Sequence, residues 1–398
     1  GSANCDMPQS AVFGRPGGGV LHKIFNKIIL KALRGYYKYI DIPYQIESEK
    51  KREEWLVLNT IPRSVKRTHL TKEEKQSVIT FWGITPASYE EFEIYKTFNG
   101  FDMRFMPMSI YLPLITRRLN DYKYTEILEH KSMFGYLTNG YVHYPKCFLR
   151  VINGEAYSQD MAQTDMDSAL KSCLKEERVV IKESVGGSGG KGISIIKFNG
   201  LSNAQRLELL YKDINNRRND YVIQEYLEET AELKRFNPTS VNTIRVQSLY
   251  LNGRWSAVTI ILRFGGENAE VDNSCSGGIC VGVHPDGRLF EYGFNNQAQR
   301  FDKIKDIVFK DTCLSFIPKL LKYVEECHTK QYPIIKYIGW DFMIDTDGNP
   351  VCIEINSCQN GHIIFQLSAG PTFGDRTKEV IDYCNSKKFV YNKSVIQY

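Results

Sequence analysis

A glycine-rich segment between two β-branched runs constrains the fold of this chain more than any other feature. Val179–Glu183 and Ile193–Phe198 are typical of short strands, and five of the seven residues from 186 to 192 are glycine. Glycine at this density lets backbone N–H groups approach an anion closely, and Lys191 adds positive charge. The alternative is a flexible hairpin tip that binds nothing. We therefore predict a β-hairpin whose tip binds phosphate.

Three well-known phosphate-binding loops do not fit this segment. The Walker A pattern fails because Val185 stands where its first glycine is required, and Gly192 replaces the Ser or Thr that binds magnesium. Gly187, Gly189 and Gly192 match the dinucleotide pattern, but that motif opens a helix, whereas an isoleucine-rich strand follows here. A protein kinase is excluded because the sequence has neither an HRD nor a DFG motif. What remains is a glycine-rich hairpin lying over nucleotide phosphates.

A second hairpin, with residues 346–349 as its turn, carries two carboxylates. Its Asp-Gly turn and its apolar flanks predict a pair of antiparallel strands. If Asp345 pairs with Pro350, Asp341 lies directly opposite Glu354, with Cβ atoms about 5 Å apart. The two carboxylates then share one face of the hairpin and repel each other.

A divalent cation would relieve this repulsion. Asn356 projects from the same face as Glu354, because side chains alternate along a strand. Carboxylate and amide oxygens are the ligands that magnesium prefers. We therefore favour a magnesium site formed by Asp341, Glu354 and Asn356. The alternative is that Asp341 pairs with a lysine or an arginine.

Together and in this order, the two hairpins resemble the ATP-grasp superfamily, and more narrowly its sugar-transfer-associated family. The resemblance runs from Leu128 to Gly370 and does not extend to the N-terminal third. No single motif is decisive, but the ordered series is specific. The segments that carry it are His130–Ser132, Ile181–Glu183, Val222–Leu227, Asn237–Val246, Arg263, Val271–Asn273, Gly277–Ile279 and Ile353–Asn356.

The resemblance implies a role for each of these segments. Arg245 and Arg263 would stabilise the transferred phosphoryl group and the acylphosphate, and Asn273 the tetrahedral oxyanion. Taken alone, each arginine is more often a salt-bridge partner. Two magnesium ions would bridge the carboxylate hairpin and the phosphates of ATP. The residues expected to bind ATP are Lys131, Lys182, Gly187, Ser188, Gly189, Gly190, Lys191, Gln224, Glu225, Tyr226 and Leu227.

Two polar residues after the metal strand are open to two interpretations. His362 and Gln366 follow that strand, where enzymes of this family often position the acceptor substrate. Simple local hydrogen bonding is the equal alternative for both. The acceptor pocket therefore stays unassigned.

The implied fold class is α+β: an ATP-grasp fold in which two α+β subdomains clamp ATP between antiparallel sheets, preceded by a mainly helical region. Capping-box spacings after Thr71 and Ser88 predict helices in that region, and a further helix is expected over 303–328, kinked at Pro318. The expected domains are a flexible or tag segment 1–20, a helical region 21–125, a pre-grasp region 126–175, a glycine-loop subdomain 176–225 and a metal-binding subdomain 226–390.

The implied activity is that of an ADP-forming, ATP-dependent carboxylate–amine ligase. ATP would phosphorylate a carboxylate to an acylphosphate, and an amine would then displace phosphate to give an amide. The resemblance further implies that an amino acid or similar amine is joined to a sugar in capsule or O-antigen synthesis. One alternative is a kinase on the same scaffold that phosphorylates a hydroxyl of a sugar or another small molecule. A second alternative is a nucleotide-binding module without catalysis.

Composition and charge limit the possible partners of the protein and its cellular compartment. The net charge of +5 on 398 residues is too small to indicate a nucleic-acid partner, and no stretch approaches the roughly 20 apolar residues of a membrane span. The ten cysteines form no CxxC pair, so we expect them to be reduced and buried, which favours the cytoplasm. Lys23–Tyr39 predicts a helix with a basic stripe. An ordinary surface helix is the favoured interpretation, and contact with the inner face of a membrane is the alternative.

Overall fold

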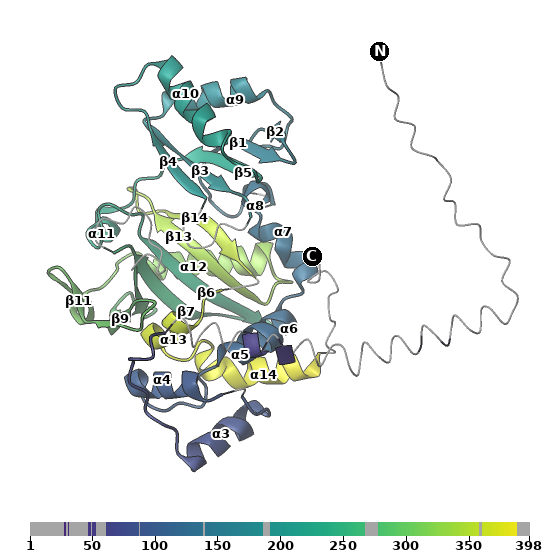
Figure 1. The fold of residues 1–398 in the computed structure, drawn as a ribbon, viewed down its shortest axis with the longest axis vertical. Coiled ribbons are helices and arrows are strands. Elements are labelled where there is room, and N and C mark those ends of the chain that lie inside the picture. Colours follow the sequence, from purple (N-terminus) through teal and green to yellow (C-terminus); the bar gives the residue numbers. More distant parts are fainter. Residues whose placement is uncertain are drawn as a thin grey trace, which may run out of the picture. The chain divides into compact units, whose positions relative to one another are not determined.

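The chain divides into two compact units, residues 1–49 and 50–398. Every strand that the structure describes belongs to the second unit (Figure 1). The basic stripe Lys23–Tyr39 lies outside the described residues, apart from Ile28 and Lys31. This computed structural model describes residues 28, 31, 47, 48, 50–52, 61–86, 88–137, 140–185, 192–266, 278–357 and 360–387.

The smaller of two main sheets has five antiparallel strands in the order β2-β1-β5-β3-β4. Its apolar face packs against α9 and α10, which lie together on one side of it (Figure 1). The sheet begins at Cys147, earlier than the subdomain boundary at residue 176 that we expected. Its elements are β1 (Cys147–Ile152), β2 (Glu155–Tyr157), α9 (Met166–Ser172), η3 (Cys173–Lys175), β3 (Arg178–Glu183), β4 (Ile193–Lys197), α10 (Asn203–Ile214) and β5 (Tyr221–Glu225).

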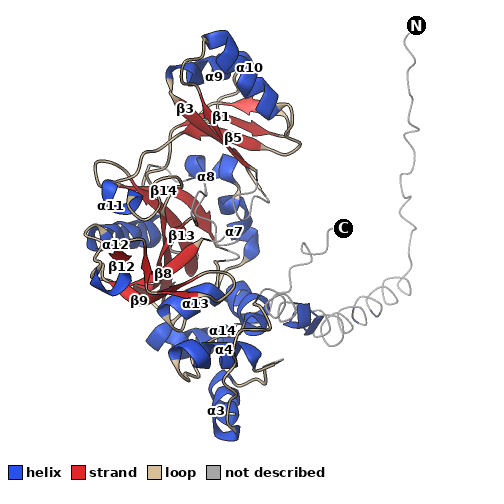
Figure 2. Cartoon of the chain, turned by 60° about the vertical axis from the view of Figure 1, so that its left-hand side comes forward, coloured by secondary structure: helices blue, strands red, loops and turns tan. Residues whose placement is uncertain are grey.

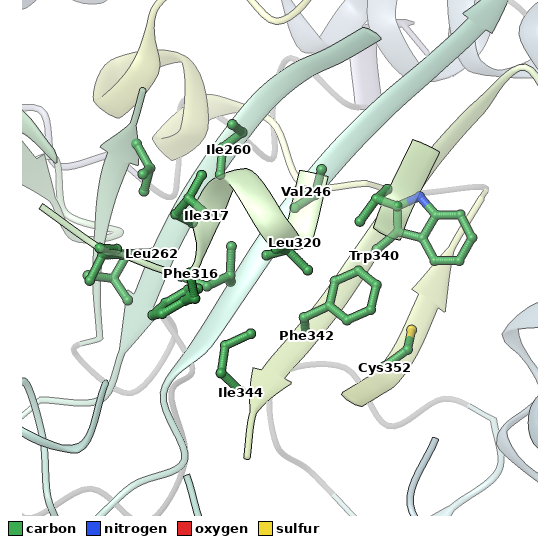
Figure 3. Close-up of a cluster of buried hydrophobic side chains, with 14 of the residues drawn as sticks. Val246, Ile260, Leu262, Phe316, Ile317, Leu320, Trp340, Phe342, Ile344 and Cys352 are labelled. Carbon is green, nitrogen blue, oxygen red and sulfur yellow. The ribbon is translucent and has the colours of Figure 1, made fainter. Parts of the chain in front are cut away.

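The larger sheet has seven antiparallel strands in the order β10-β9-β8-β7-β6-β13-β14. Figure 2 labels β8, β9, β13 and β14 of this sheet. One face packs against α12 (Ile317–Glu326), whose Ile317 and Leu320 belong to the same apolar cluster as Val246, Trp340 and Phe342 (Figure 3). Because side chains alternate along a strand, the opposite face is free to carry polar residues. Its strands are β6 (Thr243–Leu251), β7 (Arg254–Phe264), β8 (Ile279–Val283), β9 (Leu289–Phe294), β10 (Arg300–Phe301), β13 (Tyr337–Ile344) and β14 (Pro350–Asn356).

The prediction of a helix over residues 303–328 is wrong for the first half of that range. That half contains a two-stranded sheet, β11 (Lys303–Ile304) and β12 (Ile307–Val308), followed by the short turn η6 (Phe309–Asp311). Pro318 lies in the first turn of α12, where the missing N–H breaks no helical hydrogen bond, so it starts the helix and does not kink it. The remaining short elements are α11 (Ala231–Lys234), η7 (Cys327–Gln331) and η8 (Gly374–Arg376).

Residues 61–119 contain several helices and share a second apolar core with α13, α14 and the larger sheet, whereas Leu128 and Phe134 belong to the core that packs under α12. Thr71 caps its helix as predicted, since its hydroxyl accepts from the Glu74 N–H and the Glu74 carboxylate accepts in return. The helix predicted after Ser88 is confirmed, since α4 begins at Glu90, but its capping box is not: the N-cap is Tyr89, which makes no side-chain cap. The helices are α3 (Lys72–Trp82), α4 (Glu90–Asn99), α5 (Met108–Ile110), η2 (Tyr111–Thr116), α6 (Arg117–Leu119), α7 (Tyr122–Glu129), α8 (Lys131–Leu137), α13 (Ile363–Ala369) and α14 (Thr377–Ser386).

The carboxylate hairpin β13–β14 places Asp341 opposite Glu354, as predicted, but by a different route. Ile344, and not Asp345, pairs with Pro350, so the predicted turn pairing is wrong by one residue. Asp345 belongs to the turn, where its carboxylate accepts the N–H of Asn349 at 2.7 Å. A β-bulge between Asp341 and Phe342 then shifts the register back.

Seven described cysteines are free thiols. Six are buried as expected, whereas Cys313 is exposed, so the prediction of burial is wrong there. None of the described helices has both the length and the apolar character needed to cross a membrane.

Candidate functional site

A row of charged side chains lies on the polar face of the larger sheet. Arg245 of β6 pairs with Asp341 of β13, which in turn pairs with Glu354 of β14. Directly paired residues of antiparallel strands project from the same face, and Asn356 projects there too. The apolar cluster under α12 anchors the other face of these strands (Figure 3). The core therefore fixes the strands whose polar faces form the site.

Asp341 is buried and accepts four hydrogen bonds. Arg245 donates hydrogen bonds to both carboxylate oxygens, from Nε to Oδ1 at 2.5 Å and from Nη2 to Oδ2 at 2.7 Å. Arg263 donates from Nη1 to Oδ1 at 3.1 Å, and Asn356 donates from Nδ2 to Oδ2 at 3.4 Å. A carboxylate offers about four acceptor positions, so these contacts use all of them. The structure thus shows the arginine pairing that the sequence left open for Asp341.

The electrostatics of this cluster keep its members charged. Burial would raise the pKa of Asp341, but the charges of Arg245 and Arg263 outweigh it, and the pKa lies below its ordinary value. Burial would likewise lower the pKa of Arg245, but Asp341 holds it above its ordinary value. Arg245 also donates from Nη1 to the Asn360 carbonyl at 2.8 Å, so all three of its nitrogens are engaged. Arg263 is the more exposed of the two arginines, at 16% against 7% of its side chain.

Lys131 and Glu354, one expected to bind ATP and the other magnesium, contact each other. The Lys131 ammonium at the start of α8 lies 3.0 Å from Oε1 of Glu354 on β14. The Lys131 backbone N–H donates to the Ser184 carbonyl at 3.0 Å, directly after β3. This contact therefore joins the acidic edge of the larger sheet to the strand that leads into the glycine loop.

The other residues expected to bind ATP lie in or next to the smaller sheet, or outside the described residues. Lys182 on β3 and Gln224 on β5 project from the face opposite α9 and α10, because Ile181 and Ile223 belong to the core on that side. Glu225 ends β5, and Tyr226 and Leu227 follow it half-buried. The expected residues outside the described part are Gly187, Ser188, Gly189, Gly190, Lys191 and, among the catalytic candidates, Asn273.

The donor atoms on β14 fit a magnesium ion. Magnesium is held by one or two carboxylates, with water and phosphate oxygens completing its shell. The Glu354 side chain is one-third exposed and carries a carboxylate beside the amide of Asn356. Among the described residues, no group of three or more His, Cys, Asp or Glu side chains could hold a metal without such outside ligands. The metal role of Asp341, Glu354 and Asn356 stays a prediction that these donor types support.

His362 and Gln366 form structural hydrogen bonds, which reach residues far away in the sequence as well as local ones. His362 is buried, stacks on Tyr111 with ring centroids 4.1 Å apart, and hydrogen-bonds through Nε2 to the Met106 carbonyl. Gln366 donates to the same carbonyl at 2.9 Å and to the Tyr95 hydroxyl at 2.9 Å. Both side chains therefore hold α13 against the helices that precede β1.

Stability should fall between pH 6.5 and 4 because of two buried histidines. Burial lowers the pKa of His328 and of His362 to about 4, whereas the unfolded chain keeps the ordinary 6.5. The unfolded state therefore binds more protons in this window, so the free energy of unfolding decreases as pH falls through it. Urea unfolding at pH 7 and pH 4.5 measures the loss. His362→Gln should reduce it and exposed His143→Gln should not; an undiminished loss in His362→Gln would contradict this explanation.

Sequence reasoning missed Arg150. This side chain is fully buried on β1 and donates from Nη1 to the Ser132 carbonyl at 2.6 Å. The signal was present, because an arginine interrupts the otherwise apolar run Cys147–Ile152. A charge inside an apolar strand normally requires a partner.

The comparison with protein families decides the affiliation of the chain. Residues 114–382 match the family described as sugar-transfer associated ATP-grasp, a wider range than the resemblance from Leu128 to Gly370. The chain belongs to this family. The expected α+β ATP-grasp fold class is thereby confirmed, and the two antiparallel sheets with their helices agree with it. ATP-grasp proteins are ATP-dependent ligases.

Among curated proteins no match was found, whereas solved ATP-grasp structures are similar. D-alanyl-alanine synthetase A from Vibrio cholerae is 9% identical with a TM-score of 0.37, covering 64% of this chain and 63% of its own. The biotin carboxylase complex from Campylobacter jejuni is 11% identical with a TM-score of 0.40, covering 68% and 48%. The biotin carboxylase domain from Hydrogenobacter thermophilus, complexed with MgADP, is 16% identical with a TM-score of 0.36, covering 70% and 49%. This ATP-grasp chain thus spans about half to two thirds of these structures, and at such TM-scores they carry no argument about activity.

Proposed function

We propose that this ATP-grasp protein is an ADP-forming ligase that activates a carboxylate as an acylphosphate and joins it to an amine. The observation that carries the proposal is the 3.0 Å contact between Lys131 and Glu354. It brings a cation tied to the glycine-loop strand next to the acidic hairpin. A triphosphate with bound magnesium needs both kinds of charge in one place.

Each residue of the site has a role in this reaction. Lys131 and Lys182 would neutralise the phosphates of ATP. Glu354 and Asn356 would hold magnesium, which supplies positive charge to the phosphates when bound. Asp341, the expected third ligand, would have to exchange one of its four hydrogen bonds for the ion. Arg263 would stabilise the transferred phosphoryl group.

The hydrogen bonds that hold the Arg245 guanidinium in place support a role for this residue as a fixed positive charge. Its guanidinium is held by both oxygens of Asp341 and by the Asn360 carbonyl, so it cannot turn toward a ligand without breaking these bonds. It would act on the reaction through its charge and by orienting Asp341. Preorganised charge of this kind requires no rearrangement during the reaction.

The proposed chemistry has two balanced steps. A carboxylate oxygen attacks the γ-phosphorus of ATP, the bond to the β-phosphate oxygen breaks, and ADP leaves. The amine nitrogen then attacks the acyl carbon, the bond to the phosphate oxygen breaks, and phosphate and one proton leave. Holding the carboxylate beside ATP, and then the amine beside the acylphosphate, supplies much of the acceleration.

The family description supports a sugar among the substrates. We propose that an amino acid or a similar amine is joined to a sugar in the synthesis of a surface polysaccharide, such as a capsule or an O-antigen. The free and mostly buried described cysteines support a reducing, cytoplasmic setting.

ADP release should depend on both a carboxylate and an amine. The measurement is coupled ADP detection against a panel of uronic acids, amino sugars and amino acids, with MgATP. With hydroxylamine in place of the amine, the acylphosphate should be trapped as a hydroxamate. ADP release without any hydroxamate would indicate a kinase, and wild-type protein that binds ATP without releasing ADP across the panel would indicate a non-catalytic module.

A further inference from the structure

Arg150 is a buried cation without a counter-charge among the described residues. It lies on β1 with none of its surface exposed. Its Nη1 donates to the Ser132 carbonyl at 2.6 Å, whereas its Nε and Nη2 have no hydrogen-bond partner in the described part of the chain. No described carboxylate forms an ion pair with it. A buried charge in this condition destabilises the fold unless something else compensates it.

The smaller sheet places Arg150 in line with Lys182. Arg150 pairs with Val222 of β5, and Val222 pairs with Lys182 of β3. All three project from one face, opposite the core under α9 and α10. Two strand spacings put the backbones of the two cationic residues about 10 Å apart.

Arg150 is also connected to Lys131. Its bond to the Ser132 carbonyl fixes the first turn of α8, where Lys131 is the preceding residue. The Ser132 hydroxyl is hydrogen-bonded to the Ser184 hydroxyl, and the Lys131 N–H donates to the Ser184 carbonyl. Arg150 is therefore hydrogen-bonded to the helix that begins with Lys131 and shares a cross-strand row with Lys182, the two lysines of the described part that are expected to bind phosphate.

We propose that Arg150 is a positioning residue of the nucleotide site, whose buried charge is compensated by the phosphates of bound ATP. Water in a buried site can satisfy an N–H group but does not neutralise a guanidinium. The multiply charged phosphate chain does, and charges interact more strongly through protein than through water. The proposal rests on the proposed ATP-binding function.

The test measures stability and binding in the same variants of the full chain. Arg150→Met removes the charge and keeps most of the volume. We expect a higher melting temperature without ligand and, by calorimetry, affinity for MgADP lower by about tenfold or more. Affinity for adenosine, which has no phosphate, should not change. A merely structural arginine would give the opposite stability result, because its removal lowers the melting temperature.

Arg206 provides a matched control. It lies on α10, on the other side of the same sheet, and donates to the Leu174 and Glu176 carbonyls at 2.7 and 3.2 Å. Arg206→Met should lower the melting temperature and leave MgADP affinity unchanged. If Arg150→Met does not fold, Arg150→Gln, which keeps a donor for the Ser132 carbonyl, gives the same readouts.

The outcomes separate this inference from the proposed function. Wild-type protein that does not bind MgADP would overturn the proposed function itself. Wild-type binding with equal binding by the Arg150 variant would overturn only the inference. A lower melting temperature with unchanged MgADP affinity would likewise make Arg150 a structural residue.

Discussion

Glu354→Gln should abolish ADP release while leaving the fold intact. The substitution removes the negative charge expected to hold magnesium beside Asn356 and keeps the size of the side chain. Because the loss of metal-dependent charge stabilisation is worth several kcal/mol, turnover should fall by about a thousandfold or more. The ion pair with Lys131 is partly exposed, with 33% of the Glu354 side chain accessible, so its loss should change the free energy of unfolding by only about 1 kcal/mol or less.

Two measurements and one control make this prediction specific. Coupled ADP detection gives turnover, and paramagnetic resonance of Mn²⁺ with ADP shows whether the metal still binds. Glu208→Gln, on the exposed surface of α10, should behave as wild type in both. A Glu354→Gln variant that retains turnover would remove Glu354 from the metal site.

Asp341→Asn should destabilise the protein strongly. The substitution leaves Arg245 buried without its counter-charge, and breaking a buried ion pair of this kind costs about 3–5 kcal/mol. Arg263 loses the same partner, but it is closer to the surface, so water can solvate its charge and the loss of its ion pair costs less stability. The free energy of unfolding in urea, followed by tryptophan fluorescence, measures the effect.

A double variant tests the physical reason. Asp341→Leu with Arg245→Met replaces the buried pair by apolar side chains and should be more stable than Asp341→Asn alone, because no uncompensated charge remains at residue 245. Asp341→Asn with wild-type stability but lost Mn²⁺ binding would instead show that Asp341 serves mainly the metal. The experiment therefore decides between the two interpretations of this residue.

Local sequence patterns predicted the strands of the site well. The Asp-Gly turn and its apolar flanks predicted a hairpin in which Asp341, Glu354 and Asn356 share one face, and the register confirms that Asp341 lies opposite Glu354. The turn was misplaced by one residue, because the pattern contains no sign of the compensating bulge. At Pro318 the pattern was ambiguous, since proline both begins helices and breaks them.

The partners of the charged side chains could not be predicted in this way. Asp341 meets Arg245 across 96 residues of sequence, and Lys131 meets Glu354 across 223. His362 reaches the Met106 carbonyl across 256 residues. Such contacts depend on how strands and helices pack, and a local pattern carries no information about that packing.

By itself, the sequence determined where the strands of the two site hairpins form, which face of the carboxylate hairpin is polar, and which donor atoms the chain offers to phosphate and metal. These properties follow from backbone preference and from the two-residue period of a strand, both of which are local. Only the tertiary structure decided that Asp341 is held by arginines, that Lys131 contacts Glu354, and that Arg150 is buried without a described counter-charge. Charge pairing depends on distance in space, which the folded packing sets.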